Sequence, residues 1–125
     1  NLVKELAGEI PILGICLGHQ TIGVVFGGQI KQAPELVHGK TTRMKAKDKS
    51  IVQGLGEFKA TRYHSLVVEE ASLADRFEVI VRTETGLMMG IADEENKLYG
   101  LQFHPESIMT DKGQEVVGNF LELTR

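Results

Sequence analysis

The single cysteine of the sequence, Cys16, lies in a pattern that suits nucleophilic chemistry. Residues 14–18 read Gly-Ile-Cys-Leu-Gly, the Gly-x-nucleophile-x-Gly form that joins a strand to a helix through a sharp turn. Such a turn exposes the nucleophile and aims the backbone N–H of Leu17 at an oxyanion formed on an attacked carbonyl. The positive end of the following helix dipole is expected to favour the thiolate. Without this context, a lone cysteine among apolar neighbours is more often a buried core residue.

A second chemical segment lies 88 residues further along, where residues 101–107 read Leu-Gln-Phe-His-Pro-Glu-Ser. A strand is expected to run into His104 and to stop at Pro105. If the chain stays extended, His104 and Glu106 point to the same side because side chains repeat every second residue. Glu106 could then hold one imidazole nitrogen while the other accepts the proton of Cys16, which is a catalytic triad with cysteine as nucleophile. Taken alone, a His-Pro-Glu segment is usually a simple turn.

The elements around Cys16 are expected to form a strand–turn–helix unit. Residues 2–7 predict the last turns of a helix that Gly8 ends. The apolar run 10–15 is typical of a strand buried on both faces of a parallel sheet. Residues 18–26 then predict a helix that ends at the glycine pair 27–28.

The rest of the chain predicts short strands and one closing helix. Mixed β-favouring segments indicate a small antiparallel sheet or ribbon, at residues 29–33, 41–47 and 58–62, and another short strand is expected at 66–68. A helical turn is expected at 73–76, and strands are expected at 77–82, 87–92 and 98–103, with an acidic turn at 93–96. An amphipathic helix is predicted over 112–123. No repeat or linker interrupts the sequence, so residues 1–125 are interpreted as one compact α/β unit.

The composition excludes several classes of protein. With 125 residues, 42% hydrophobic and 25% charged, the chain has ordinary values for one soluble globular domain. Its net charge of −3 gives no electrostatic basis for binding nucleic acid or an anionic membrane. We find no apolar run of the ~20 residues that a membrane span needs and no secretory signal. One cysteine cannot form an internal disulfide, so a reducing, cytoplasmic setting is expected. The four histidines are scattered and have no second cysteine beside them, so no structural zinc site is expected.

Four segments together resemble a known family. Residues 11–20 and 100–107 resemble the signatures of the class I, triad-type glutamine amidotransferases. Residues 38–41 and 62–68 resemble the glutaminase subunit (component II) of anthranilate synthase or aminodeoxychorismate synthase. The resemblance covers essentially the whole chain in the right order. It implies a three-layer α/β/α fold, with a flavodoxin-like, mostly parallel sheet and a small antiparallel ribbon.

The resemblance implies a role for each catalytic candidate. Cys16 resembles the nucleophile that forms a glutamyl thioester. His104 resembles the base that activates the thiol and then protonates the leaving ammonia, and Glu106 resembles the group that orients the histidine. Leu17 would give one oxyanion N–H.

Substrate contacts are implied in the same way. Gln20 resembles a contact to the substrate glutamine, and the backbone of Ser65 and Leu66 resembles a clamp on its amino-acid end. Without the resemblance, Gln20 would be interpreted as a solvated helix residue and Ser65 as a turn former. His38 is interpreted as an interface or structural residue, and His64 as a residue that orders the clamp.

The implied reaction converts glutamine to glutamate and ammonia, without a metal or organic cofactor. The ammonia would pass to a chorismate-using synthase subunit in a heteromer, and any Mg²⁺ would belong to that partner. The sequence does not separate supply of anthranilate from supply of p-aminobenzoate. Rival interpretations are an amidotransferase for carbamoyl phosphate, GMP or CTP synthesis, a cysteine peptidase or γ-glutamyl hydrolase, and a non-catalytic module that keeps the fold.

The start of the chain departs from the family pattern. Family members carry earlier strands of the sheet and a glycine-rich loop that supplies the second oxyanion N–H, and neither is found in this sequence. Loss of one such donor costs on the order of 10²–10³ in rate. We therefore expect residues 1–125 to be a partial domain that alone is a weak or inactive glutaminase and only marginally folded.

Overall fold

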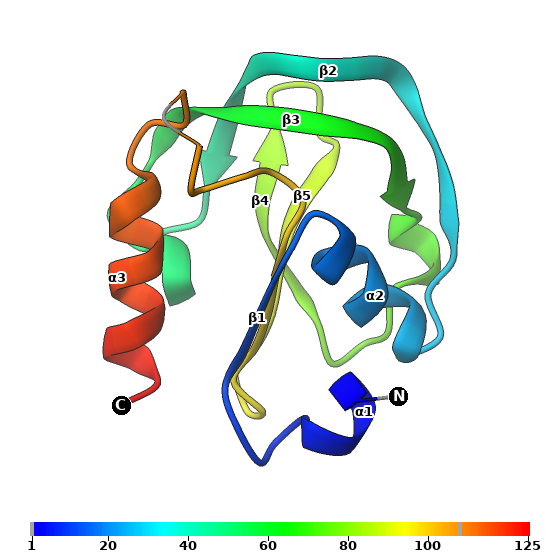
Figure 1. Ribbon diagram of the computed structural model, residues 1–125, viewed down its shortest axis with the longest axis vertical. Helices are drawn as coiled ribbons and strands as arrows, with labels where there is room; N and C mark the ends of the chain where they lie inside the picture. The colour runs from blue at the N-terminus through cyan, green and yellow to red at the C-terminus, as the bar shows by residue number, and fades with distance from the viewer. Residues whose placement is uncertain (1, 108) are drawn as a thin grey trace.

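The computed structural model describes residues 2–107 and 109–125, and for residues 34–40 and 63–65 it describes the backbone but not the side chains. A six-stranded sheet has helices on both of its faces (Figure 1). The helices are α1 (Leu2–Leu6), α2 (Leu17–Val25) and α3 (Gly113–Leu123), with 3-10 turns η1 (Ser50–Val52) and η2 (Glu70–Ser72). The strands are β1 (Ile12–Ile15), β2 (Ile30–Ala46), β3 (Glu57–Val68), β4 (Glu78–Thr83), β5 (Met88–Asp93) and β6 (Leu98–Leu101).

The sheet has the strand order β1-β6-β5-β4-β2-β3. Strands β1 and β6 are parallel, and Ile15 lies opposite Leu101 at their carboxyl ends. Strands β4, β5 and β6 form an antiparallel meander, and β2 pairs with both β4 and β3 in antiparallel fashion. The α/β class predicted from the sequence is confirmed. In the described part of the sheet, however, the parallel pairing is confined to β1 and β6.

Two apolar cores lie on opposite faces of the sheet. Strand β6 feeds both because its side chains alternate: Leu98 belongs to one core, while Tyr99 and Leu101 belong to the other. Helix α2 covers the first core through Ile22, and α3 covers the second through Val116. Figure 1 shows α2 and α3 on the two sides of β1 and β5, which gives the expected helix–sheet–helix layering.

The middle of the chain forms longer strands than the sequence predicts. The segments expected at 29–33 and 41–47 belong to the single strand β2, and those at 58–62 and 66–68 belong to β3. The register shifts between Gln32 and Val37 and again between His38 and Lys40, so the ribbon continues past Pro34 and Gly39 as irregularities. The expected helical turn at 73–76 is also wrong, because the short helical turn lies earlier, at η2.

The other predicted elements are confirmed with small shifts at their ends. Gly8 follows α1 with a left-handed φ of 88°, as expected for a residue that ends a helix. Strand β1 differs from its prediction because it lies at an edge of the described sheet and three of its four residues are only half-buried. Among the described helices, none is long and apolar enough to cross a membrane.

Candidate active site

Cys16 occupies a strained turn between β1 and α2. Its φ of 53° and ψ of −101° are unusual for a residue with a side chain, and such strain is concentrated at functional sites. The turn is held at both ends, because the Cys16 N–H donates to the Leu101 carbonyl at 2.7 Å and its carbonyl accepts the Gln20 N–H at 3.1 Å. The first bond places Cys16 at the carboxyl end of the parallel pair β1 and β6.

The two glycines that flank the turn have different roles. A Cβ atom on Gly14 would lie 2.7 Å from the backbone of Gly18 and 2.7 Å from the Ile22 side chain. Gly14 is therefore required by the close approach of strand and helix. A Cβ atom on Gly18 would meet nothing within 4 Å, so close packing does not require this second glycine.

The thiol of Cys16 is not activated by the turn alone. Burial raises its pKa above the ordinary value, and the Glu106 carboxylate adds to the increase. The Leu17 backbone N–H and the Gln102 side chain lower the pKa, but their effects do not outweigh burial. That the helix dipole favours the thiolate stays a prediction, and the Leu17 N–H at the start of α2 acts in the same direction. Because the net direction of the pKa shift is upward, a base that takes the thiol proton would assist attack by this cysteine.

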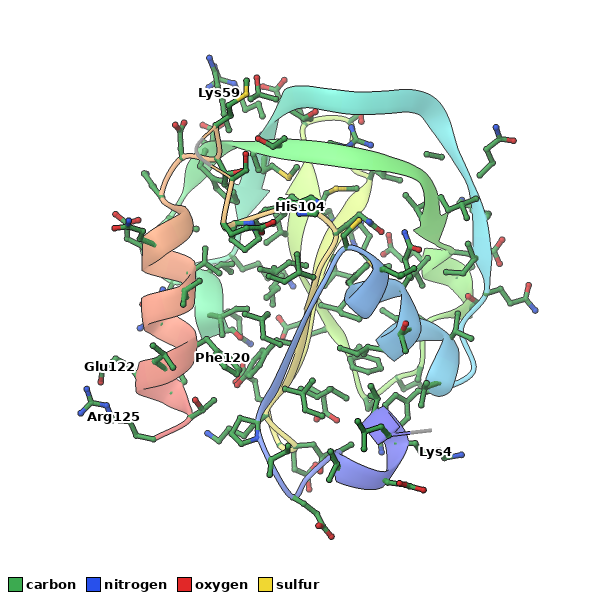
Figure 2. The ribbon with its side chains drawn as sticks, in the orientation of Figure 1. Lys4, Lys59, His104, Phe120, Glu122 and Arg125 are labelled. Carbon is green, nitrogen blue, oxygen red and sulfur yellow. The ribbon has the colours of Figure 1, made fainter. Side chains whose placement is uncertain are left out.

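His104 and Glu106 are hydrogen-bonded, as the sequence predicts, although the segment forms a turn and does not stay extended. The distance from His104 Nδ1 to Glu106 Oε2 is 2.6 Å. The His104 side chain is 24% exposed and that of Glu106 is 62% exposed, so the pair opens to solvent on the carboxylate side. In the view of Figure 2, His104 lies just below β3, near the upper end of β1. Because Nδ1 is bonded to Glu106, proton exchange with a nucleophile would use Nε2.

The segment after β6 is anchored by residues that the sequence analysis did not single out. The His104 N–H donates to the Thr61 carbonyl of β3 at 3.1 Å, and the His104 carbonyl accepts the Thr110 hydroxyl at 2.6 Å. Thr110 Oγ1 also accepts the Thr61 N–H at 3.0 Å, so Thr61, His104 and Thr110 are all joined by hydrogen bonds. A Cβ atom on Gly113 would clash with the Pro105 carbonyl, so the start of α3 packs directly on this segment. No local signal marks these threonines, because they become neighbours only through the fold.

A chain of side-chain amides joins β3, α2 and β6 beside the nucleophile. Gln20 Nε2 donates to the Leu66 carbonyl at 3.0 Å and to Gln102 Oε1 at 3.2 Å. Gln102 Nε2 then donates to Cys16 Sγ at 3.6 Å, within range for a large sulfur acceptor. The sequence analysis did not predict a role for Gln102. Its even spacing from His104 and Glu106 is only a partial signal, because residues 102–107 form bends and a turn and do not continue the strand.

The structure therefore brings together most of the predicted site residues. Cys16 and Glu106 interact electrostatically, the Leu17 N–H lies against the sulfur, and the Leu66 carbonyl contacts Gln20. The predicted clamp is described only in part, because the side chain of Ser65 lies outside the described residues, as do those of His38 and His64. His19 is fully buried on α2 and packs against Gly100.

The described part of the chain holds no set of side chains that could bind a metal ion together. No group of three or more His, Cys, Asp or Glu side chains there could hold a metal ion. The arrangement instead offers a thiol, a base with an orienting carboxylate, and a backbone N–H at the turn. These groups suit acyl transfer to sulfur.

Comparison with known proteins places this arrangement in a wider context. Residues 1–123 match the family described as Glutamine amidotransferase class-I. The chain is 50% identical, over 97% of its length, to anthranilate synthase component 2 of Cyanophora paradoxa, of which it covers 65%. It is 47% identical, over 98% of its length, to aminodeoxychorismate/anthranilate synthase component 2 of Bacillus subtilis, of which it covers 64%. The chain thus spans slightly less than two thirds of the length of these relatives.

Solved structures share the fold. A Thermoplasma acidophilum protein named for GMP synthase superposes with a TM-score of 0.83 at 29% identity, over 91% of this chain and 57% of that one. A glutamine amidotransferase from Thermotoga maritima superposes with a TM-score of 0.74 at 22% identity, over 97% of this chain and 50% of the other. The described strands and helices are therefore arranged as in proteins of this kind.

Proposed function

The chain belongs to the class I glutamine amidotransferase family, and from this premise we propose that its site hydrolyses glutamine to glutamate and ammonia. The observation that carries the proposal is the placement of two groups at neighbouring strand ends. Cys16 follows β1, the His104–Glu106 pair follows β6, and the Cys16 N–H bonds directly to the last residue of β6.

The reaction follows from the groups at the site. His104 Nε2 takes the thiol proton of Cys16, and the sulfur attacks the carboxamide carbon of glutamine. The Leu17 N–H stabilises the oxyanion that forms on the former carbonyl oxygen. When the C–N bond breaks, His104 returns the proton to the leaving ammonia and a glutamyl thioester remains. Water activated by the same base then hydrolyses the thioester, which releases glutamate and restores the thiol.

The raised pKa of Cys16 gives His104 a defined task in this scheme. A thiol that ionised readily by itself would need no base, whereas a thiol held protonated by burial needs one in place. Glu106 supports the base because its carboxylate holds Nδ1 and stabilises the imidazolium that forms.

We also propose the destination of the ammonia from the names of the relatives. Relatives 43–50% identical are called component 2 of anthranilate synthase or of aminodeoxychorismate synthase, which indicates a second component as partner. A chorismate-using synthase subunit in the cytoplasm is the partner that this likeness favours. Identity to the protein named for GMP synthase is lower, at 29%.

Labelling of Cys16 by a glutamine analogue that carries an electrophilic ketone tests the glutaminase. We expect mass spectrometry of the full chain to find the label on Cys16, and excess glutamine to block it. His104→Ala should lower the labelling rate by on the order of 10²–10⁴, the usual contribution of a general base. Thermal unfolding of the variant verifies that it is folded. If neither protein is labelled on Cys16, the cysteine is a structural residue and the proposal is wrong.

A further inference from the structure

Gln102 is a buried polar residue that contacts the nucleophile and has no task in the proposed mechanism. Its side chain is fully buried, with 0% of its surface exposed, and its backbone N–H is held by the Met89 carbonyl of β5 at 2.8 Å. A buried amide costs free energy unless its groups are hydrogen-bonded. Both described bonds of the Gln102 amide lead into the site, one from Gln20 and one to Cys16.

The direction of these hydrogen bonds is fixed by a backbone carbonyl. An amide side chain can be turned over, so the positions of its nitrogen and oxygen have to follow from its partners. The Leu66 carbonyl can only accept, so the Gln20 atom 3.0 Å away must be the nitrogen. The second N–H of that nitrogen donates to the Gln102 oxygen at 3.2 Å, which turns the Gln102 nitrogen toward the Cys16 sulfur.

We propose that Gln102 is a positioning residue that holds Cys16 Sγ and stabilises its thiolate through one amide N–H, while Gln20 fixes the orientation of that amide. An N–H donor favours the charged form of a sulfur, and hydrogen bonds to charged groups are stronger than those between neutral groups. The inference rests on the proposed function only for the identity of the nucleophile.

This gives Gln20 a task beyond the substrate contact expected from the sequence. Both N–H groups of its amide are already used inside the protein, by Leu66 and by Gln102. Its oxygen alone is then left to meet a ligand. Gln20 is 9% exposed, so it is a buried link and not the solvated helix residue of the alternative interpretation. This series of hydrogen bonds therefore connects β3, the strand of the predicted clamp, to the sulfur whose ionisation it affects.

Other ionisable groups near the sulfur have to be separated from this effect. Glu106 raises the pKa of Cys16 and His104 is the base beside it, both from the segment after β6, and His19 is buried on α2 three residues after the cysteine. Glutamine has no charge of its own, so replacement of Gln102 by methionine leaves all three groups unchanged. Methionine also has nearly the same length as glutamine and donates no hydrogen bond.

The test is the pH dependence of Cys16 alkylation by iodoacetamide in the full chain, which reports the thiolate without any need for glutamine. In Gln102→Met we expect the midpoint of the pH profile to move up, so that the rate at pH 8 falls roughly five- to tenfold. The rate at high pH, where every thiol is ionised, should stay near that of the unmodified chain. A merely structural role would change both limbs of the profile alike.

Two further variants keep the test decisive. Gln20→Met leaves the sulfur contact in place but frees the Gln102 amide to turn, so we expect a smaller upward shift of the midpoint. The double variant should behave like Gln102→Met alone, because both substitutions interrupt the same series of hydrogen bonds. Gln53→Met, at an exposed glutamine away from the site, is the matched control and should not move the midpoint.

An unchanged midpoint in folded Gln102→Met overturns the inference. If that variant does not fold, an unchanged midpoint in Gln20→Met overturns it instead. The proposed function can fail separately: the midpoint would then shift as expected while Cys16 of the unmodified chain takes no label from the glutamine analogue.

Discussion

Glu106 has two opposite effects on the site at the scale of single residues. Its carboxylate bonds His104 at 2.6 Å and supports the base, but its negative charge also raises the pKa of Cys16. Glu106→Gln should separate these effects. At pH 8 the thiol should ionise more readily, so alkylation by iodoacetamide should become about twofold faster, as expected for a single charge screened by solvent. Glutamine hydrolysis should slow by roughly tenfold or more, because the imidazole loses the group that orients it.

The control for this prediction is Glu95→Gln, which removes the same charge from the exposed turn between β5 and β6. Both rates should stay at the values of the unmodified chain. Slower alkylation in Glu106→Gln would contradict the prediction, since it would mean that Glu106 favours the thiolate.

Sequence reasoning found the catalytic candidates but not the residues that support them. Cys16, His104 and Glu106 lie in motifs whose local spacing already predicts a turn and a same-side pair. Gln102 shares the parity of His104, yet its partner Gln20 is 82 residues away in the sequence. The pairing of β1 with β6 brings the two glutamines together, and neither motif predicts that pairing.

At the scale of elements, the junction of β1 and α2 offers a pair of glycines for comparison. Gly14→Ala would place a Cβ atom 2.7 Å from backbone atoms of Gly18, which cannot move without distortion of the turn. We expect this variant to lower the free energy of unfolding by about 1–3 kcal/mol, as for other overpacked sites. Urea unfolding monitored by circular dichroism measures the change.

Gly18→Ala is the matched variant because its Cβ atom would meet nothing within 4 Å. It lies in the first turn of α2, where alanine favours the helix over glycine by up to about 1 kcal/mol. We expect unchanged or slightly higher stability. Equal losses of stability in the two variants would show that the close approach at Gly14 is not what the junction requires.

The ribbon of β2 and β3 shows why element boundaries were harder to predict than element types. Pro34 and Gly39 usually mark the ends of strands, and the sequence analysis accordingly divided the region into short segments. In the structure β2 continues past both residues, because the two long strands pair again beyond each register shift. The partner strand β3 supplies hydrogen bonds that keep β2 extended, and these cannot be predicted from the local sequence of β2. Apolar runs such as β6, in contrast, were placed correctly from their own residues.

At the scale of the whole molecule, Tyr99 links the sheet to the closing helix α3. Its buried hydroxyl should also make the free energy of unfolding fall at alkaline pH. Its ring is fully buried and packs edge-on against Phe120 of α3, with ring centroids 5.8 Å apart. Its hydroxyl donates to the Glu94 carboxylate at 2.9 Å. Burial raises the pKa of Tyr99 well above the ordinary value of about 10, and the bond to Glu94 raises it further.

The sign of the pH effect follows from the neutral form being favoured in the folded chain. Below pH ~10 the phenol is protonated in both the folded and the unfolded chain, and its contribution is fully present. Above that pH the unfolded chain releases the proton while the folded chain retains it. The contribution of Tyr99 is therefore lost progressively as pH rises toward its folded pKa.

Tyr99→Phe should reveal this loss because it keeps the ring and removes the ionisable group. Near pH 7 we expect the variant to be less stable by about 1 kcal/mol, the usual value of one hydrogen bond. Between about pH 9 and pH 11 the unmodified chain should lose stability more steeply than the variant, so that the difference between them shrinks or reverses. Urea unfolding at a series of pH values measures both curves. Glu94→Gln, which keeps the phenol but removes the charge beside it, should give an intermediate slope, whereas parallel curves for all three proteins would show that Tyr99 does not govern the alkaline limit.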